Sequence, residues 1–270
     1  IRGGLGLAAV ERPTEPLLFL SLRFAIAAVL VGAFSLPMLR RLTRRQVIVG
    51  CVVGLALCAG YAFQTFGLQR TTASNAGFLT GLYVVLTPLI GALVHRKLPS
   101  PTTVAGAGLA VVGLLLIAAP TGLTIGLGDG LVLVCALCFA IHFVLLGRYA
   151  SSSPLPALVT LQLAVTALVT GALSAAGERA PIPTESGVWV AIVVTAVLAT
   201  AVAFFLQTAA QRFIPPSRTT LILTMESPMA ALFGYLMLDE RLGARGFAGA
   251  ALILAAMLVA ELWDPEMESV

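Results

Sequence analysis

The sequence predicts an all-α integral membrane protein of ten transmembrane helices, arranged as two inverted five-helix repeats whose first helix is truncated in this chain. Hydrophobic residues make up 59% of the 270 residues and charged residues only 10%. Soluble domains are about 45–50% apolar and about 25% charged, and a water-soluble fold cannot hide so much apolar surface. Lipid must therefore surround most of this chain.

Nine apolar runs are long enough to cross a bilayer, which takes about 20 residues of helix. Turn-forming residues such as Pro, Gly and Ser separate them. The opening run 1–10 is apolar but too short to span, and we interpret it as the end of a first helix. Counted from that helix, the runs are helices 2 to 10, at residues 17–39, 46–66, 75–94, 103–119, 130–146, 155–176, 188–210, 219–238 and 244–262.

The cations between these runs predict the orientation, because cytoplasmic loops carry the excess of Arg and Lys. One side holds nine cations and the other holds five. We therefore expect a multi-pass membrane protein with both native termini in the cytoplasm. The cytoplasmic set is Arg40, Arg41, Arg44, Arg45, Arg96, Lys97, Arg148, Arg212 and Arg218, and the opposite set is Arg12, Arg70, Arg179, Arg241 and Arg245.

The chain matches itself after a shift of 143 residues. Gln64-Thr65 falls on Gln207-Thr208, and the run 105–107 falls on the identical run 248–250. The shift pairs helix 3 with helix 8, 4 with 9, and 5 with 10, which predicts one repeat at 1–119 and a second at 120–270. Because five spans are an odd number, the two copies must have opposite orientation, as in many secondary transporters.

Several short segments carry a family resemblance. They are Leu22-Arg23-Phe24, the run 76–88, Glu226-Ser227-Pro228, and the run 239–242. With these segments the chain resembles the drug/metabolite transporter superfamily, specifically proteins with paired EamA-type units, and most of all YddG-type exporters of amino acids. The resemblance implies that helices 1–4 and 6–9 surround a central cavity, with helices 5 and 10 outside. One departure is that Arg96-Lys97 stands where the second repeat has Asp239-Glu240, so a role of that acidic pair cannot be carried to the first repeat.

The resemblance and the inverted repeat favour a secondary transporter that exports small polar metabolites by alternating access. The resemblance implies that these are amino acids, aromatic ones among them, and that the protein lies in the bacterial inner membrane. The alternatives are a carrier of another metabolite or drug class, and a channel or receptor without carrier turnover. No HExxH or Gly-x-Ser-x-Gly motif suggests an enzyme, and no cofactor is expected. The net charge of +4 lies in short clusters, which is not the footprint of a nucleic-acid partner.

Polar residues inside apolar helices are candidates for the transport path, because burying them in lipid is costly. Helix 4 carries Thr80, Tyr83 and Thr87 at helical spacing, and the shift places Tyr83 opposite Glu226. Glu226 could bind a substrate ammonium or a coupling proton, or form a structural ion pair with Arg23. Tyr83 could equally be a packed aromatic residue.

Four further polar residues have two interpretations each. Arg23 could hold a carboxylate or extend to the interface. Gln64 and Gln207 suit a zwitterion or a helix–helix hydrogen bond, and Gln162 is similar. His142 could titrate near neutrality or be a hydrogen-bonded core residue.

Two prolines and several small residues complete the predictions. Pro88 and Pro228 each free a helical carbonyl and could be bending points or static kinks. Small residues on helices 5 and 10 predict close packing within the chain, with a homodimer as the alternative. Cys135, Cys138 and His142 lie on one helix face, but we interpret the cysteines as packing residues and expect no metal.

Overall fold

The computed structural model describes most of the predicted spans. It covers residues 15–96, 98–118, 126–178, 182–229, 232–233 and 243–262. The predicted first helix at 1–10, the acidic pair Asp239-Glu240 and the end of helix 9 lie outside the described residues.

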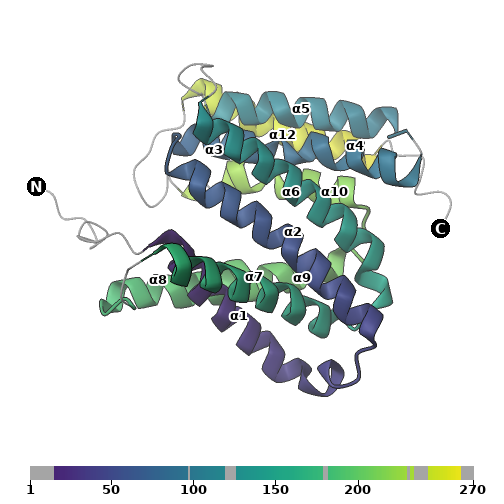
Figure 1. The fold of residues 1–270 in the computed structure, drawn as a ribbon. Coiled ribbons are helices and arrows are strands. Elements are labelled where there is room, and N and C mark those ends of the chain that lie inside the picture. The colour runs from purple at the N-terminus through teal and green to yellow at the C-terminus, as the bar shows by residue number, and fades with distance from the viewer. Residues whose placement is uncertain are drawn as a thin grey trace, which may run out of the picture. The chain divides into compact units, whose positions relative to one another are not determined.

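All secondary structure in these ranges is helical (Figure 1). The helices of the first repeat are α1 (Pro16–Leu39), α2 (Arg44–Leu68), α3 (Ala73–Gly81), α4 (Tyr83–His95) and α5 (Pro101–Ala118). The second repeat has α6 (Leu127–Tyr149), the 3₁₀ turn η1 (Ala150–Ser152), α7 (Leu155–Gly177), α8 (Ser186–Ala196), the π-helical turn η2 (Val197–Val202), α9 (Ala203–Ala210), α10 (Pro216–Leu223) and α12 (Ala244–Leu262).

Within the described ranges, six helical stretches are long and apolar enough to cross a membrane. Two shorter apolar helices, Pro101–Ile117 and Ala244–Val259, correspond to the predicted helices 5 and 10. This confirms the all-helical membrane protein, whereas the count of ten spans stays a prediction. The six stretches are Pro16–Leu39, Arg44–Leu68, Asn75–His95, Leu127–Ser152, Leu155–Gly177 and Ser186–Ala210.

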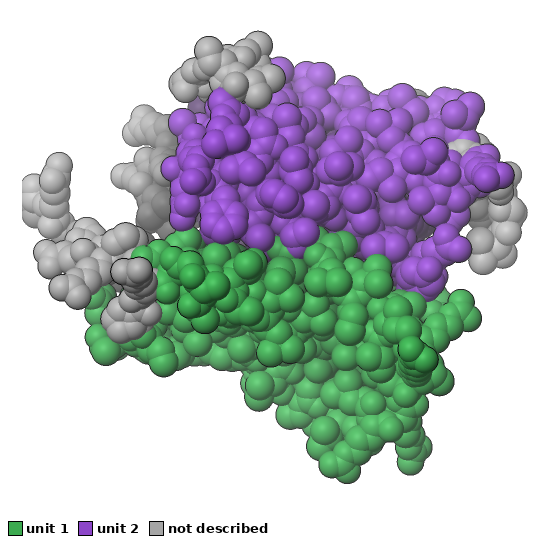
Figure 2. Space-filling model, viewed as in Figure 1, with its two compact units in different colours: residues 1–58, 150–209 green, residues 59–149, 210–270 purple. Residues whose placement is uncertain are grey.

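The described helices form two compact units, coloured separately in Figure 2. Unit 1 combines residues 1–58 with 150–209, and unit 2 combines 59–149 with 210–270. Each unit therefore draws on both sequence repeats, and neither unit corresponds to one half of the chain.

In unit 1, polar contacts join α1 to α7 along most of their length. Ser21 Oγ donates to the Ala167 carbonyl at 3.1 Å, and the hydroxyls of Ser35 and Thr160 lie 2.9 Å apart. At the start of α1, both carboxylate oxygens of Glu178 accept backbone N–H bonds, from Leu17 and Leu18, at 2.8 Å each. These bonds satisfy N–H groups that have no partner within the helix.

In unit 2, α5 and α12 approach each other through glycines. A Cβ added to Gly113 would lie 2.7 Å from the Gly249 carbonyl oxygen, and one added to Gly249 would lie 2.6 Å from that of Gly113. Only glycine permits backbones to come this close. Helices α5 and α12, the predicted helices 5 and 10, thus pack on each other within the chain, whereas a homodimer through them stays a prediction.

The packed helices of each unit are repeat mates that run in opposite directions. In unit 1, the start of α1 meets the end of α7 at Glu178, and its later turns meet the start of α7 at Thr160. In unit 2, Gly113 lies near Ile253 while Ile117 lies near Gly249. Helix α1 is therefore antiparallel to α7, and α5 is antiparallel to α12.

Candidate functional site

Helix 4 is interrupted at Leu82, between α3 and α4. The Leu82 N–H donates three residues back to Leu79 at 3.2 Å, and its carbonyl accepts from Leu86 at 3.1 Å. The three-residue bond is tighter than the four-residue bond of an α-helix and marks a local break. Tyr83 is the first residue after it.

Helix 9 repeats this interruption at Met225, which is 143 residues beyond Leu82. The Met225 N–H donates to Ile222 at 3.0 Å, and its carbonyl accepts from Met229 at 3.0 Å. Thr224, just before the break, donates its hydroxyl to the Leu221 carbonyl, a type of bond that bends helices. Glu226 follows the break as Tyr83 does in helix 4.

Both breaks lie before the prolines that we expected to interrupt these helices. Pro88 lies inside α4, which continues from Tyr83 to His95. Pro228 lies in the first turn after the second break, where a missing N–H costs no helical bond. A gating role of Pro88 and Pro228 stays a prediction, and the observed discontinuities are at Leu82 and Met225.

Tyr83 and Thr87 are both buried in α4. The Tyr83 ring centroid lies 5.3 Å from that of Phe143 on α6, and the Thr87 hydroxyl donates to the Tyr83 carbonyl at 2.7 Å. Glu226 is exposed. The two residues that follow the breaks both belong to unit 2.

The predicted amide candidates differ in their partners. Gln64 Nε2 donates to the Thr80 hydroxyl at 3.4 Å, and both side chains are half-buried. Gln162 Nε2 donates to the Thr208 hydroxyl at 3.2 Å, and Gln162 is fully buried. The Nε2 atom of Gln207 is buried with no hydrogen-bond partner among the described residues.

Arg23 contacts the π-helical turn of helix 8 within unit 1. Its Nε donates to the Thr200 hydroxyl at 2.6 Å, and its Nη2 donates to the Ala199 carbonyl at 3.2 Å. A π-turn disturbs the regular hydrogen bonding of a helix, and the guanidinium supplies a donor at that place. Arg23 therefore has a structural task in unit 1, and the predicted pair with Glu226 would join different units and stays a prediction.

His142 is 1% exposed and packs edge-on against Phe143, with 5.7 Å between the ring centroids. Cys135, on the same helix, is fully buried. Both observations fit residues of a helix core, and a titrating role for His142 stays a prediction.

A cavity of about 270 Å³ opens in unit 2, where α4 ends and α5 and α10 begin. Among the described residues, its lining has two basic side chains, four hydroxyls and no acidic side chain. The lining is Thr87, Pro88, Gly91, Ala92, His95, Leu98, Pro99, Ser100, Thr103, Val144, Pro215, Pro216, Ser217 and Arg218.

Local sequence positions these polar groups. The Ser100 hydroxyl accepts the N–H of Thr103 at 3.2 Å and so caps α5. Pro215 precedes α10 and Pro216 opens it, which is the favoured place for proline in a helix. Ser217 and Arg218 therefore lie in the first turn of α10, beside the capped start of α5.

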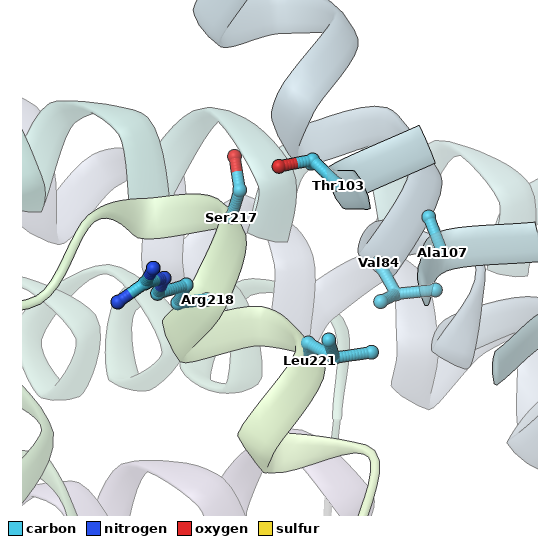
Figure 3. Close-up of a pocket in the computed structure, with 6 residues that line it drawn as sticks. All are labelled: Val84, Thr103, Ala107, Ser217, Arg218 and Leu221. Carbon is cyan, nitrogen blue, oxygen red and sulfur yellow. The ribbon is translucent and has the colours of Figure 1, made fainter. Parts of the chain in front are cut away.

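A narrower space of about 10 Å³, room for about one water molecule, shares Thr103, Ser217 and Arg218 with the cavity. Its other lining residues are Val84, Ala107 and Leu221. Figure 3 shows the hydroxyls of Thr103 and Ser217 on one side of this space and the apolar side chains below them. The guanidinium of Arg218 extends from α10 away from Val84 and Ala107.

Sequence reasoning missed most of this cavity. Of the candidate site residues, Pro88 lines it, as does Thr87 of the polar stripe. His95, Ser100, Thr103 and Ser217 were overlooked because they lie at helix ends, where polar residues usually face water. The available signal was the match of Ser217 with Ser74 under the repeat shift, which placed Ser217 at a repeated helix start.

Asp129 was missed for the same reason. It lies in the first turn of α6 and is only 7% exposed. Its carboxylate accepts hydrogen bonds from the Thr71 hydroxyl, the Gly126 N–H and the Asn75 amide. These bonds join the start of α6 to the segment between α2 and α3, and give the carboxylate a structural role.

These features define a multi-pass helical membrane protein built from paired, oppositely directed helices. Two stretches, residues 7–119 and 126–261, match the sequence model of the EamA-like transporter family. Because they cover most of the chain, this protein belongs to the EamA-like transporter family, and it is a transporter and not an enzyme. The double match also indicates that the family unit occurs twice.

Two known proteins extend the comparison. An uncharacterized transporter of Archaeoglobus fulgidus is 34% identical over 248 residues, which are 92% of this chain and 77% of the relative. A protein of known crystal structure superposes with a TM-score of 0.81, covering 95% of this chain and 91% of its own. At 20% identity that structure shows the fold alone.

Proposed function

We propose that this EamA-family transporter is a secondary carrier that exports small polar metabolites, in the first place amino acids, by alternating access. The observation that carries the proposal is the pair of interruptions at Leu82 and Met225. Discontinuous helices at matching places of two repeats are typical of transporters whose halves move about a site near the membrane midplane.

The hydrogen bonding at each break supports movement there. At Leu82 and at Met225 the backbone N–H makes a three-residue bond, whereas the carbonyl keeps its four-residue bond. A change of angle at such a point disrupts few bonds, whereas bending a regular helix disrupts several. Equal hinges in the two repeats would let helices 4 and 9 change shape together.

The chemistry beside the breaks supports a polar cargo. Thr80 and Tyr83 flank the first break, Gln64 contacts Thr80, and Glu226 follows the second break. Hydroxyl, amide and carboxylate groups together can bind both an ammonium and a carboxylate. Amino acids, which carry both groups, are therefore the first substrates to test.

The test is uptake of labelled amino acids into proteoliposomes that contain the purified protein, with and without an applied pH gradient. Export appears as uptake by protein molecules that insert into the vesicles in the reversed orientation. Proteolysis of the loops exposed outside the vesicles distinguishes the two orientations. Saturable uptake above empty vesicles is expected. Flux that rises linearly without saturation would make the protein a channel and contradict the proposal.

Proton coupling through Glu226 is tested in the same vesicles. Glu226→Gln keeps the shape of the side chain and removes its charge, so transport driven by a pH gradient should fall while exchange without a gradient persists. His142→Ala is the second variant, because His142 is the other titratable candidate. Unchanged pH dependence in both variants would remove these residues from any coupling step.

The inverted arrangement has its own test. Single cysteines in the 40–45 loop and near residue 182, placed in a variant without the four native cysteines, should react with impermeant reagents from opposite faces of the membrane. Labelling from one face would contradict the orientation on which alternating access depends.

A further inference from the structure

We propose that the π-helical turn η2 (Val197–Val202) is a conformational switch of the carrier, and that Arg23 on α1 is the positioning residue that holds it in the form seen here. In the other form, α8, η2 and α9 make one regular α-helix, with α9 turned about its axis. The proposal rests on the proposed carrier function for its part in transport, whereas the register of α9 can be measured without transport.

The π-turn frees a backbone carbonyl to which Arg23 donates. In an α-helix the Ala203 N–H would donate to the Ala199 carbonyl, four residues back. Here it donates to the carbonyls of Leu198 and Thr200, and the Ala199 carbonyl accepts from Arg23 Nη2 at 3.2 Å. Arg23 Nε also donates to the Thr200 hydroxyl at 2.6 Å. These bonds stabilise the π form, because in a regular helix the Ala199 carbonyl would have a backbone partner.

The burial pattern explains why a π-turn occurs at this place. Buried residues recur at every fourth position along α8, η2 and α9. In a regular α-helix each step of four residues turns the buried face by about 40°, so five steps would carry it about halfway round the helix. A π-turn takes up an extra residue, which removes about 100° of this drift. The buried residues are Val188, Ile192, Ala196, Thr200, Phe204 and Thr208.

The first repeat makes the matching contact with a regular α-helix. The shift of 143 residues matches Arg23 with Thr166, and η2 with residues 54–59 of α2, which is α-helical throughout Arg44–Leu68. The Thr166 hydroxyl donates to the Gly54 carbonyl at 3.4 Å, so a side chain from the neighbouring helix contacts the matching turn in both repeats. The same repeat element thus occurs in an α form and in a π form, as a two-state element requires.

The register of α9 decides which of its side chains faces Gln162 on α7. In the π form, Gln162 Nε2 donates to the Thr208 hydroxyl at 3.2 Å. If α8 stays in place while η2 becomes regular, each residue of α9 advances by about 1.5 Å and 100°. Gln207 then takes the place of Thr208 opposite Gln162.

Opposing contributions keep the two forms close in free energy. The Nε2 atom of Gln207 is buried with no hydrogen-bond partner among the described residues, and a buried donor without a partner destabilises the π form. The hydrogen bonds of Arg23 stabilise that form. Removal of Arg23 should therefore shift the protein toward the α form.

The first experiment measures the register by cysteine cross-linking in a purified variant without the four native cysteines. Gln162→Cys is combined with Thr208→Cys in one protein and with Gln207→Cys in another, and both react with a short bifunctional thiol reagent. The 162/208 pair should cross-link faster when Arg23 is present. Arg23→Met should shift the ratio of the two rates toward the 162/207 pair by about tenfold, the effect of losing a hydrogen bond to a charged group.

Arg245→Met is the matched control for this experiment. Arg245 also donates to a helix carbonyl, that of Leu115 at 3.5 Å, but it lies on α12 in unit 2. The ratio of cross-linking rates should be the same in Arg245→Met as in the parent. An unchanged ratio in Arg23→Met as well would overturn the positioning role of Arg23.

The second experiment removes the extra residue of the turn. Deletion of Leu198, an exposed residue of η2, should make the helix regular while α9 keeps its present face toward α7. Arg23→Met should then lower the thermal unfolding midpoint of the parent but not that of the deletion variant. Leu198→Ala keeps the chain length and is the control, in which Arg23→Met should cost as much as in the parent. An equal loss in the deletion variant would overturn the link between Arg23 and the π-turn.

Transport tests the switch itself. A helix without the extra residue cannot alternate between the two forms, so deletion of Leu198 should lower the maximal rate of amino-acid transport about tenfold or more, because conformational steps set many turnover rates. The KM should stay within about twofold. A parent-like maximal rate in the deletion variant would overturn the switch and leave the carrier intact.

The cross-linking pairs decide the outcome if the deletion variant does not fold. The 162/207 pair should cross-link faster when an amino-acid gradient drives turnover, and a rate that turnover leaves unchanged would overturn the switch. Absence of saturable transport in the parent would overturn the carrier function and with it the part of the turn in transport. The cross-linking ratio and the unfolding midpoints would still decide whether Arg23 holds the register.

Discussion

The two compact units use their polar residues in different ways. In unit 1, Arg23, Gln162, Ser35 and Glu178 are all engaged in hydrogen bonds between helices. In unit 2, the polar groups of α4, α5 and α10 surround a cavity, and Glu226 is exposed beside a break. The named polar residues of unit 1 stabilise contacts between helices. In unit 2 some polar residues, such as Asp129, do the same, whereas others line a cavity.

This difference teaches that a polar residue in a membrane helix is not by itself a transport residue. Hydrogen bonds from a neighbouring helix can offset the free-energy cost of burying the residue, just as a bound substrate can. We therefore expect two kinds of variant. Changes at packed residues of unit 1 should lower stability, and changes at cavity residues of unit 2 should lower substrate affinity. Four predictions test this division, in order of their expected effect on stability.

The largest loss of stability is expected from Gly54→Leu in unit 1. A Cβ at Gly54 would lie 2.9 Å from the Gln162 Cα and 2.8 Å from the Val165 Cβ, so α2 and α7 would have to separate. Overpacking of this kind costs about 1–3 kcal/mol and sometimes more. Thermal unfolding in detergent measures the loss. Gly77→Leu is the control, since nothing lies within 4 Å of a Cβ there, and an equal loss in both would contradict the interpretation.

A smaller loss is expected from Arg23→Ala. The change removes donors to Thr200 and to the Ala199 carbonyl, and loss of a charged hydrogen bond costs about 2 kcal/mol. The unfolding midpoint should fall while the KM of transport stays within about twofold, which corresponds to less than about 0.5 kcal/mol. A large rise in KM with unchanged stability would make Arg23 a substrate ligand and break the comparison.

Glu178→Ala should cost less again, about 1 kcal/mol, because loss of a helix N-cap typically has that effect. The carboxylate accepts two N–H bonds at the start of α1 and one hydroxyl bond from Ser174. Glu178→Gln keeps an acceptor oxygen and should lose about half as much. The comparison of the two unfolding midpoints checks this, and identical midpoints for Glu178→Ala and the parent would argue against the cap.

Gly91→Leu in unit 2 should cost no stability. Nothing lies within 4 Å of a Cβ at Gly91, and leucine favours a helix over glycine by about 0.8–1.0 kcal/mol or slightly less. Because Gly91 lines the cavity, the side chain fills part of it, and if substrate enters there the KM of transport should rise. An unchanged affinity together with a raised midpoint would show that this part of α4 does not face the ligand.

Most helices could be predicted from the sequence, because a helix that crosses a bilayer needs a long apolar run. The run 17–39 became α1 and the run 155–176 became α7, each within one or two residues. Shorter-range departures were not readable. The break at Leu82 has no proline beside it, and a continuous apolar run hides a single three-residue hydrogen bond.

The candidate site was less predictable than the fold. Residues such as Arg23 and Gln162 stood out as polar positions in apolar helices, but sequence cannot show that another helix satisfies them. Ser217 and Thr103 did not stand out, because at helix ends polar residues are ordinary. The interleaving of the units was equally hidden, since it depends on contacts between segments about 100 residues apart.

Because each unit combines distant segments of the chain, the units can assemble only in a certain order during synthesis. Unit 1 needs residues 150–209 to join residues 1–58, so α1 must wait in the bilayer until α7 leaves the ribosome. At about 5–20 residues per second, the intervening segment takes on the order of ten seconds to translate. Throughout that interval the surfaces around Gly54 and Ser35 lack the α7 residues against which they pack. We therefore expect membrane chaperones to bind these early helices.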